Sequence, residues 1–402
     1  MSRRQPRQSD TGANGVPHVA LVFKQLRASG GAERMASVFL DVFRSFDVRL
    51  SVVARHMDGV PDGFEFHRVN PPHLGRAGRV TGFARAACRK LSSLRPDLVL
   101  SQEHMPCCHV YRAGGGAHAE WLRQRRRVQG PLKRTWQRWD PHQRAKLALE
   151  RATYESPHLR AVICNSAMVR DDILRHYRVA PERLHVIENA LDPDAYRPPA
   201  NARREALALR QKLGVPAGAA LWLFVGSGFE RKGLDVAVRA LARAPGTPHL
   251  AVVGRDRHAR HYRRLAARSG VAGRVHFVGR QADVRPYYWA GDGLLHPALY
   301  EAYGLVVLEA MAAGLPVLGS RQCGAANALI RQGENGYLND ALDIDAWADA
   351  IGRIDGVADR ESLRRAAMAA AMPHDLARLR GQVRELCDYL LAGVRSGPAA
   401  GA

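Results

Sequence analysis

The sequence predicts an α/β protein built from two doubly wound, Rossmann-like domains that face each other across a cleft. Short apolar runs alternate with longer amphipathic runs, which is typical of a parallel sheet covered by helices on both faces. The alternation stops between residues 188 and 207, in a segment rich in Pro, Asp and Asn, and then starts again. A length of 402 residues with 46% hydrophobic residues also suits two domains better than one.

The first half of the chain supplies the elements of one domain. Apolar runs predict strands at 18–23, 48–54, 97–102 and 160–166. Amphipathic runs predict helices at 31–46, 80–94 and 167–177. Asn165 or Ser166 is the expected N-cap of the third helix. We assign residues 17–190 to this domain, and we expect the basic, polar residues 1–16 to form a disordered tail.

The second half repeats this organisation. Apolar runs predict strands at 219–228, 249–254, 274–279, 293–298 and 315–320. We place the linker at 191–204 and the second domain at 205–374. Two doubly wound domains side by side predict a ligand-binding cleft at the carboxyl ends of both sheets.

Two glutamates stand out in "EAYGLVVLEAMAAGLPVL", residues 301–318, which otherwise has the composition of a buried core. The glycine before Leu305 allows a turn, so we expect a helix to start near Leu305 and to end before Pro316. Glu301 then lies in the loop before this helix, and Glu309 lies about one turn inside it.

The start of this predicted helix is a candidate phosphate site. Its backbone N–H groups lack helical partners and lie at the positive end of the helix, which suits an anion. These groups belong to Ala302, Tyr303, Gly304 and Leu305. Glu309 would have to project into the cleft and accept hydrogen bonds, for instance from ribose hydroxyls. Alternatively, Glu301 is an ordinary loop charge and Glu309 lies on a solvated helix face.

A second candidate motif, "GSGFERKG" (226–233), follows a predicted strand of the second domain. Arg231 and Lys232 can reach a diphosphate at the carboxyl edge of the sheet, although an ordinary basic turn is the alternative. A P-loop is not expected, because Gly233 is followed by Leu234 and not by Lys and Ser or Thr.

The order of these motifs resembles the family 4 retaining glycosyltransferases, which have the two-domain GT-B fold. The resemblance covers about residues 18–340 and is carried by "SGG" (29–31), "GSGFERKG" and "VGRQADVRPYYWAGDGLLHPALYEAYGLVVLEAMAAGLPVL" (278–318). Within the family, the sequence is most similar to the lipopolysaccharide core glucosyltransferase I type, which "VYRAGGGAHAEWL" (110–122) also resembles. The resemblance implies that residues 375–402 contain a helix that returns to the first domain, followed by a tail.

The resemblance also implies roles for the candidate residues. Glycines would let the backbone approach the sugar diphosphate closely, and a turn after a strand would contact the nucleobase. These positions are Gly30, Gly31, Gly226 and, for the nucleobase, Arg280. Glu301 would hold hydroxyls of the donor sugar and Glu309 the ribose, so both would orient the donor without attacking it. Arg231 and Lys232 would stabilise charge on the leaving group.

His118 is the candidate in the first domain, because it follows a Gly-rich turn at the end of a predicted strand. A histidine there can hydrogen-bond a sugar hydroxyl or help to move the proton of the reaction, although a lone histidine is more often structural. The family pattern often has Asp at the position of Gly115, so the resemblance does not identify the proton-transfer group. No carboxylate stands out as the nucleophile of a double displacement, and the resemblance implies front-face substitution.

No metal and no cofactor besides a UDP-sugar co-substrate are expected. Two Asp-x-Asp triplets occur, at Asp192/Asp194 and Asp343/Asp345. The first lies in the predicted linker, and the second opens an amphipathic helix, where aspartates act as caps. The six cysteines lack zinc spacing, and we expect them to be buried thiols in a reducing compartment.

The formal net charge of +22 calls for an anionic partner such as a membrane surface, nucleic acid or a phosphorylated substrate. Residues 121–139 combine seven Arg or Lys with three of the six tryptophans, and such segments suit an anionic membrane. The corresponding region of the core glucosyltransferases is associated with the membrane. We expect binding of membrane and glycolipid acceptor through Trp121, Arg125, Arg126, Arg127, Lys133, Arg134, Trp136 and Trp139. A solvated loop or an RNA-binding segment is the alternative.

The expected activity is retaining transfer of a hexose, foremost glucose from UDP-glucose, to a membrane-associated glycolipid such as the heptose of a lipopolysaccharide core. The expected location is the cytoplasmic face of the inner membrane, because the apolar run at 19–23 is too short for a signal or membrane helix. One alternative is a glycosyltransferase of capsule or exopolysaccharide synthesis with another donor. The other is a non-catalytic nucleic-acid-binding protein, although no helix-turn-helix or aromatic RNA-recognition pattern supports a nucleic-acid partner.

Overall fold

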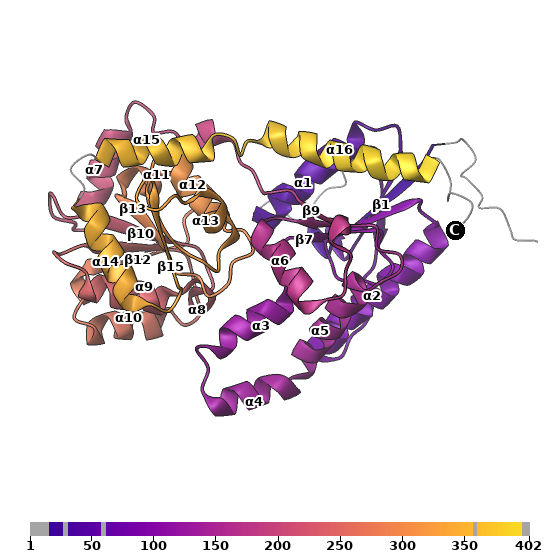
Figure 1. The fold of residues 1–402 in the computed structure, drawn as a ribbon, viewed down its shortest axis with the longest axis horizontal. Coiled ribbons are helices and arrows are strands. Elements are labelled where there is room, and N and C mark those ends of the chain that lie inside the picture. Colours follow the sequence, from indigo (N-terminus) through magenta and orange to yellow (C-terminus); the bar gives the residue numbers. More distant parts are fainter. Residues whose placement is uncertain (1–15, 27–30, 58–61, 357–359, 396–402) are drawn as a thin grey trace, which may run out of the picture.

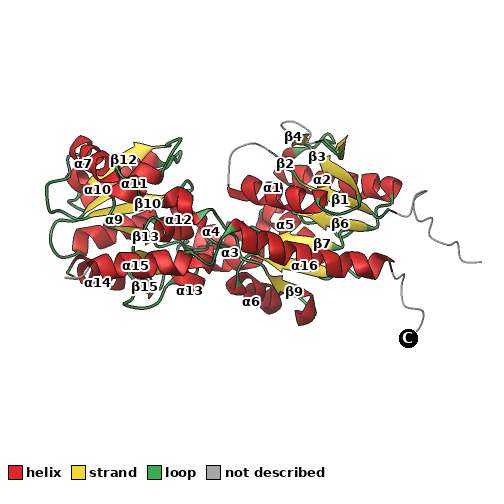
Figure 2. Ribbon diagram, turned by 90° about the horizontal axis from the view of Figure 1, so that it is seen from above, coloured by secondary structure: helices red, strands yellow, loops and turns green. Residues whose placement is uncertain are grey.

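The computed structural model describes residues 16–26, 31–57, 62–356 and 360–395. Two α/β domains lie side by side, and the last helix runs back over the first domain (Figure 1). Each domain contains one large parallel sheet with helices on both faces (Figure 2). The predicted fold class is therefore confirmed. The tail predicted at 1–16, apart from its last residue, and the tail after residue 395 lie outside the described residues.

The sheet of the first domain has seven parallel strands. In spatial order they are β5 (Phe64–Arg68), β3 (Arg49–Ala54), β1 (His18–Val22), β6 (Leu98–Ser101), β7 (Val110–Ala113), β8 (Ala161–Cys164) and β9 (Leu184–Val186). A separate short pair consists of β2 (Gln25–Leu26) and β4 (His56–Met57). The helices are α1 (Gly31–Arg44), α2 (Gly75–Leu94), α3 (His118–Arg126), α4 (Pro131–Trp139), α5 (Pro141–Tyr154), α6 (Ala167–His176) and the 3₁₀ turn η1 (Pro181–Arg183).

The sheet of the second domain has six parallel strands. Their spatial order is β12 (Val275–Gly279), β11 (His249–Val253), β10 (Leu221–Val225), β13 (Gly293–His296), β14 (Val317–Ser320) and β15 (Gly336–Asn339). The helices of this domain include α7 (Ala202–Lys212), α8 (Phe229–Lys232), α9 (Leu234–Arg243), α10 (Ala259–Arg268) and α11 (Arg285–Ala290). They continue with α12 (Leu305–Ala312), α13 (Gly324–Leu329), α14 (Ile344–Asp355), α15 (Arg360–Ala371) and the 3₁₀ turns η2 (Pro193–Tyr196) and η3 (Ala272–Arg274).

Both sheets are buried on both faces, which explains why their strands are apolar at successive positions. Val19 of β1 packs in the core that contains α1, whereas the next residue, Ala20, packs in the core under α2. Trp222 and Leu223 of β10 likewise belong to two different cores. Alternate side chains of a strand point to opposite faces, so an unbroken apolar run is what a doubly covered strand requires.

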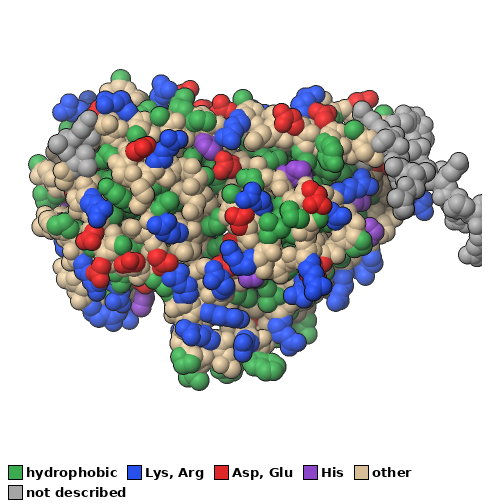
Figure 3. Space-filling view, in the orientation of Figure 1, with side chains coloured by type: hydrophobic (Ala, Val, Ile, Leu, Met, Phe, Trp, Pro, Cys, Tyr) green, Lys and Arg blue, Asp and Glu red, His purple; other side chains and the backbone are tan. Residues whose placement is uncertain are grey.

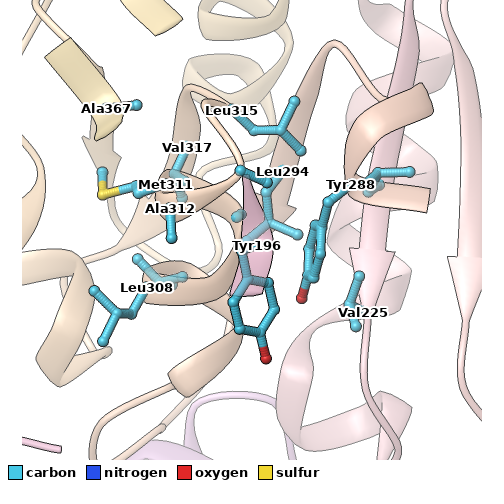
Figure 4. Packing of buried hydrophobic residues seen from close by; sticks show 14 of the residues in the cluster. Tyr196, Val225, Tyr288, Leu294, Leu308, Met311, Ala312, Leu315, Val317 and Ala367 are labelled. Atoms are coloured by element: carbon cyan, nitrogen blue, oxygen red, sulfur yellow. The ribbon is translucent and has the colours of Figure 1, made fainter. Parts of the chain in front are cut away.

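Helix α12 is packed into the core of the second domain (Figure 4). Its Leu308 and Met311 belong to the same buried cluster as Leu294 of β13 and Val317 of β14. Glu309 is the one charged residue in this helix and is 6% exposed. The apolar packing fixes the axis of α12 and so determines where its first turn lies.

The last helix, α16 (Leu376–Arg395), completes the first domain. Leu379 and Val383 of α16 are buried in the same cluster as Phe39 and Phe43 of α1. Figure 2 shows α16 running along the first domain beside α1. The chain therefore leaves the first domain after β9, builds the second domain and then returns.

Several elements differ from those predicted. The short strands β5, β9 and β15 were not predicted, and α2 begins at Gly75, earlier than the expected residue 80. Ser166 is the N-cap of α6, because its hydroxyl accepts a hydrogen bond from the N–H of Val169 at 3.2 Å. The segment predicted as the linker holds η2 and the first residues of α7, and its Leu191 and Tyr196 are buried in the core of the second domain.

The prediction that all six cysteines are thiols is wrong for one pair. Cys88 on α2 and Cys107 in the loop before β7 form a disulfide, with their Cα atoms 5.9 Å apart. The two cysteines are 19 residues apart in the sequence, and they meet only because α2 packs over β6 and β7. The sequence alone therefore did not predict this disulfide. Cys108, Cys164, Cys323 and Cys387 are buried thiols, as expected.

Candidate active site

A cavity of about 450 Å³ lies between the two domains at the carboxyl ends of their strands. The first domain lines it with the glycine turn after β7 and with the start of α3, and the second domain lines it with the end of α8 and residues 300–302. Of the four predicted catalytic residues, His118, Arg231 and Glu301 line this cavity, whereas Lys232 does not line it and contacts Glu301. Residues that are far apart in the sequence thus meet in one cavity.

Glu301 lies between two cations of the second domain. Its Oε2 atom is 2.7 Å from Nη1 of Arg231 and 2.7 Å from Nζ of Lys232. Burial by itself would raise the pKa of this carboxyl, but the charges of Lys232 and Arg231 outweigh burial and lower its pKa to about 2. Glu301 is therefore ionised, and its negative charge neutralises part of the positive charge of Arg231 and Lys232.

Two glycines make room for this cluster. Gly226, at the end of β10, has a φ of +128°, and a Cβ atom there would lie 2.6 Å from Cε of Lys232. Gly233, which follows Lys232 at φ +75°, faces the backbone of Pro297, with which a Cβ atom would overlap. Only glycine fits both positions, so the "GSGFERKG" motif holds Lys232, which is 8% exposed, in one place.

The first turn of α12 presents backbone donors, as its sequence predicts. Gly304 precedes the helix at φ +92° and provides no side-chain cap. In the described part of the chain, none of the four N–H groups of residues 302–305 has a hydrogen-bond acceptor. These donors follow directly on Glu301, so cations and helix N-terminus converge on the same region.

Glu309 is buried, which rules out the alternative of a solvated helix face. The hydroxyl of Tyr288 on α11 donates a hydrogen bond to its Oε2 atom at 2.9 Å. Tyr288 also packs in the core around α12 (Figure 4). The carboxylate is thus held in a fixed orientation, and its role toward a nucleotide ribose stays a prediction.

His118 is the first residue of α3, and its ring is fixed by α5. Nε2 of His118 donates a hydrogen bond to Oε1 of Gln143 at 2.7 Å, and the backbone N–H of His118 donates to Oε1 of the buried Glu150 at 2.6 Å. Burial and then the charge of Lys146 lower the pKa of His118 to about 4. The ring is therefore neutral at neutral pH, and its Nδ1 atom is the acceptor.

Tyr300, which was not predicted as a site residue, joins the two domains at the cavity. Its hydroxyl accepts a hydrogen bond from the backbone N–H of Ala117 at 2.9 Å. Gly116 has a φ of +71°, and a Cβ atom there would overlap with this hydroxyl. Ser166 makes a second link, donating from its hydroxyl to the carbonyl oxygen of Ala302 at 2.8 Å. These contacts hold residues 300–302 against the first domain.

The remaining predicted donor residues are placed as follows. Arg280 is exposed and directly follows β12, at the carboxyl edge of the second sheet. Gly31 is the first residue of α1, and Gly30 lies outside the described residues. Their proposed contacts with nucleobase and diphosphate stay predictions.

The basic tryptophan segment forms α3 and α4 and is therefore not a loop. Trp121 lines the cavity, whereas Trp136 and Trp139 are 79% and 71% exposed. Figure 3 shows Lys and Arg side chains crowded over the lobe that contains α3 and α4, with hydrophobic side chains at its tip. Across the described ranges, no helix has the length and apolarity needed to span a bilayer.

The same lobe also contacts the second domain. Arg127 donates to Oδ1 of Asp340 at 2.6 Å, and Nε of Arg125 lies 3.6 Å from a carboxylate oxygen of Glu230. Glu230 precedes Arg231 in α8, so one of these ion pairs lies next to the charged cluster. Two residues predicted to contact the membrane or the acceptor thus link the domains.

The Asp-x-Asp triplets serve as helix caps. Asp192 accepts a hydrogen bond from the N–H of Asp194 at the start of η2. Asp343 accepts from the N–H of Ala346 at the start of α14. Within the described residues, no group of three or more His, Cys, Asp or Glu side chains is arranged to hold a metal ion.

Some residues of the site could have been found from the sequence and others could not. Lys24, Arg55 and Glu103 line the cavity and come directly after strands, which is a signal for the carboxyl edge of a sheet. Arg79 and Lys146 also line it, but they project from the helices α2 and α5 and carry no such signal.

Two family models match the chain. The model described as "Glycosyltransferase Family 4" matches residues 29–195, and the model described as "Glycosyl transferases group 1" matches residues 219–354. Among solved structures, that of WaaG, a glycosyltransferase involved in lipopolysaccharide biosynthesis, has a TM-score of 0.75 and 29% identity. This match covers 92% of the present chain and 99% of the WaaG chain. A sucrose-phosphate synthase from Thermosynechococcus elongatus, with a TM-score of 0.71 and 21% identity, shares the fold.

The curated relatives agree with this assignment. The lipopolysaccharide glucosyltransferase WaaG of Escherichia coli (strain K12) is 35% identical over 66% of this chain and 70% of its own length. The lipopolysaccharide core biosynthesis glycosyltransferase LpsE of Rhizobium meliloti (strain 1021) is 39% identical over 39% of this chain and 44% of its own. A D-inositol 3-phosphate glycosyltransferase of Xylanimonas cellulosilytica is 34% identical over 48% of each chain, so the last two matches span about half of the relatives or less. By sequence as well as by fold, the chain therefore belongs to glycosyltransferase family 4 and is related to the lipopolysaccharide core glucosyltransferases.

Proposed function

We propose that this enzyme transfers a hexose, specifically glucose from UDP-glucose, with retention of configuration to a membrane-associated glycolipid such as the heptose of a lipopolysaccharide core. The observation that carries the proposal is the Arg231–Glu301–Lys232 cluster beside the uncapped start of α12. Arg231 and Glu301 of this cluster line the same cavity as His118. The relationship to the Escherichia coli lipopolysaccharide glucosyltransferase supports the sugar and the class of acceptor.

In this proposal, the second domain binds the donor. The diphosphate accepts hydrogen bonds from the first turn of α12 and lies near Arg231 and Lys232, while Glu301 and Glu309 hold hydroxyls of the sugar and the ribose. Negative charge grows on the leaving UDP oxygen as the bond to the sugar breaks. Fixed cations and oriented N–H groups stabilise that charge without having to reorganise.

The proton of the acceptor hydroxyl goes to the departing phosphate oxygen. The bond from the acceptor oxygen to C1 of the sugar forms on the face from which UDP leaves, so the configuration is retained and no enzyme nucleophile is required. His118 is neutral and held by Gln143, so it positions a hydroxyl group and does not supply a charge.

The lobe of α3 and α4 is proposed to bind the cytoplasmic face of the inner membrane peripherally. Exposed Trp136 and Trp139 suit the headgroup level of a bilayer, and the surrounding Arg and Lys suit anionic lipid. A membrane-bound acceptor could then reach the cavity from the base of this lobe, which Trp121 lines.

Thermal unfolding with UDP tests the donor site first. Binding of UDP to the native protein stabilises it by RT ln(1 + [L]/Kd), about 2.7 kcal/mol at a hundredfold excess over Kd. We expect UDP to raise the melting temperature in the presence of EDTA, and ADP and GDP to raise it less. No shift with any nucleotide would contradict the proposal.

Product analysis then separates this activity from the transfer of another sugar to a capsule or exopolysaccharide precursor. The enzyme is incubated with UDP-glucose, UDP-galactose or GDP-mannose and a heptose-terminated core acceptor. A glucosylated product with an α linkage supports the proposal, because the donor linkage is α. A product from another donor alone would favour the alternative enzyme.

A further inference from the structure

The part of the cavity that belongs to the first domain has an excess of positive charge. Four basic side chains line it, and the first domain offers one acidic side chain among the residues that line the cavity. The basic residues are Lys24, Arg55, Arg79 and Lys146, and the acidic residue is Glu103. Arg231 and Lys232 belong to a separate cluster of the second domain, in which both contact Glu301.

These four cations come together from separate elements. Lys24 follows β1 and Arg55 follows β3, so both lie at the carboxyl edge of the first sheet. Arg79 is on α2 and Lys146 is on α5. In the described part of the chain, none of the four forms an ion pair with a carboxylate, although Glu103 is close enough to interact with Lys24, Lys146 and Arg55. Glu103, and Glu150 near Lys146, offset part of these charges and leave a positive excess.

Arg55 shows that this is a built site and not a mobile surface patch. Its side chain is 4% exposed, lies 5.1 Å above the ring of Phe83 and donates a hydrogen bond from Nη2 to the carbonyl oxygen of Arg79. Its Nε atom is buried and has no partner among the described residues. A buried guanidinium with an unpaired N–H donor lowers the stability of the protein unless a ligand accepts a hydrogen bond from that donor.

The electrostatics of the neighbouring groups point the same way. Burial, followed by the charge of Lys24, lowers the pKa of Lys146, and burial raises the pKa of Glu103. The cations thus repel one another in a partly desolvated space. A doubly charged anion would remove this repulsion more completely than a carboxylate would.

We propose that Lys24, Arg55, Arg79 and Lys146 bind a phosphate group of the acceptor, so that the natural acceptor is a phosphorylated saccharide. This inference rests on the proposed function, because it assumes that the first-domain side of the cavity receives the acceptor. The phosphate anchors the acceptor to the part of the cavity that the first domain lines, whereas Arg231 and Glu301 line it from the second domain. The accepting hydroxyl group then faces the donor sugar.

The test uses a double variant, Lys24→Met with Lys146→Met, which keeps an unbranched side chain one atom shorter than lysine at both positions and removes two charges. Lys212→Met, at an exposed position of α7, is the matched control. Thermal unfolding is measured in saturating UDP, which occupies the donor site, with increasing inorganic phosphate or with chloride at equal ionic strength. Phosphate should stabilise the wild type and the control more than chloride does, and it should lose this effect in the double variant.

Kinetics with a core acceptor before and after phosphatase treatment form the second arm. Removing the phosphate should raise the KM of the wild type for acceptor about tenfold or more, with little change in the KM for donor. The double variant should show the high KM with both acceptors and should still be stabilised by UDP. Equal KM values for both acceptors in the wild type, or equal phosphate effects in all three proteins, would overturn the inference. If UDP fails to stabilise the wild type, the proposed function itself is wrong.

Discussion

At the scale of single residues, the site is organised around a carboxylate that two cations keep ionised. Glu301 is 15% exposed, yet its pKa is lowered to about 2, since Lys232 and Arg231 outweigh the effect of burial. Its oxygen atoms are available as acceptors for sugar hydroxyls at any physiological pH. The same contacts fix the positions of Arg231 and Lys232. The ionised state of Glu301 and the placement of the two cations therefore depend on each other.

Removing Lys232 should therefore disable the reaction. Lys232→Ala deletes a cation from the donor site and leaves Glu301 with Arg231 alone, so kcat/KM should fall by about 10²- to 10³-fold. Glu309→Ala should have a comparable effect, because it removes the proposed ribose contact and leaves the Tyr288 hydroxyl without its acceptor. Initial rates of glucose transfer measure both variants, with Lys212→Ala as the control. Wild-type rates in Lys232→Ala and Glu309→Ala together would refute the assignment of the donor site.

His118 should make the stability of the protein depend on pH. Its pKa is about 4 in the folded state and 6.5 ordinarily, so between these values the unfolded chain binds a proton that the folded chain does not. The free energy of unfolding should accordingly fall as the pH drops from 6.5 toward 4. Urea unfolding of the wild type and His118→Gln at several pH values in this window measures the effect. The variant should lose less stability on acidification, and equal losses would mean that His118 does not contribute.

At the scale of elements, the sequence predicts the buried strands and the helix α12 well, because their apolar composition is unbroken. It misses β5 and β15, whose residues are only partly buried, and it misses the disulfide, which depends on the packing of α2. The motif around Glu301 predicts the helix start and the loop position correctly. The cations on α2 and α5 could not be predicted, since their convergence depends on tertiary structure and not on a local pattern.

Helix α4 should carry the membrane affinity. Trp136 and Trp139 are exposed, so replacing both by Ala should reduce binding to vesicles that contain anionic phospholipid while leaving the free energy of unfolding nearly unchanged. Co-sedimentation with vesicles at low and high salt measures this, and Tyr389→Ala, an exposed aromatic residue on α16, is the control. Unchanged sedimentation of the double variant would exclude α4 as the docking element.

At the scale of the whole molecule, ion pairs connect the α3–α4 lobe to the second domain. Arg127 and Asp340 are partly exposed, so their pair contributes only about 0–1 kcal/mol to stability. Its effect should be on the relative placement of the domains. Arg127→Glu should open the cleft and raise the KM for acceptor. The double variant Arg127→Glu with Asp340→Arg should restore the wild-type cleft and the wild-type KM. Small-angle scattering and kinetics measure this pair of variants, and no rescue by the charge swap would contradict a direct interaction.

The return of α16 to the first domain has a consequence for how the protein is made. Residues 376–395 supply one wall of the core around α1, but the ribosome synthesises them only after the entire second domain. The second domain can fold while the chain is still being translated. The first domain keeps part of its apolar surface exposed until α16 has been synthesised. Folding of this enzyme therefore finishes in the domain that was started first.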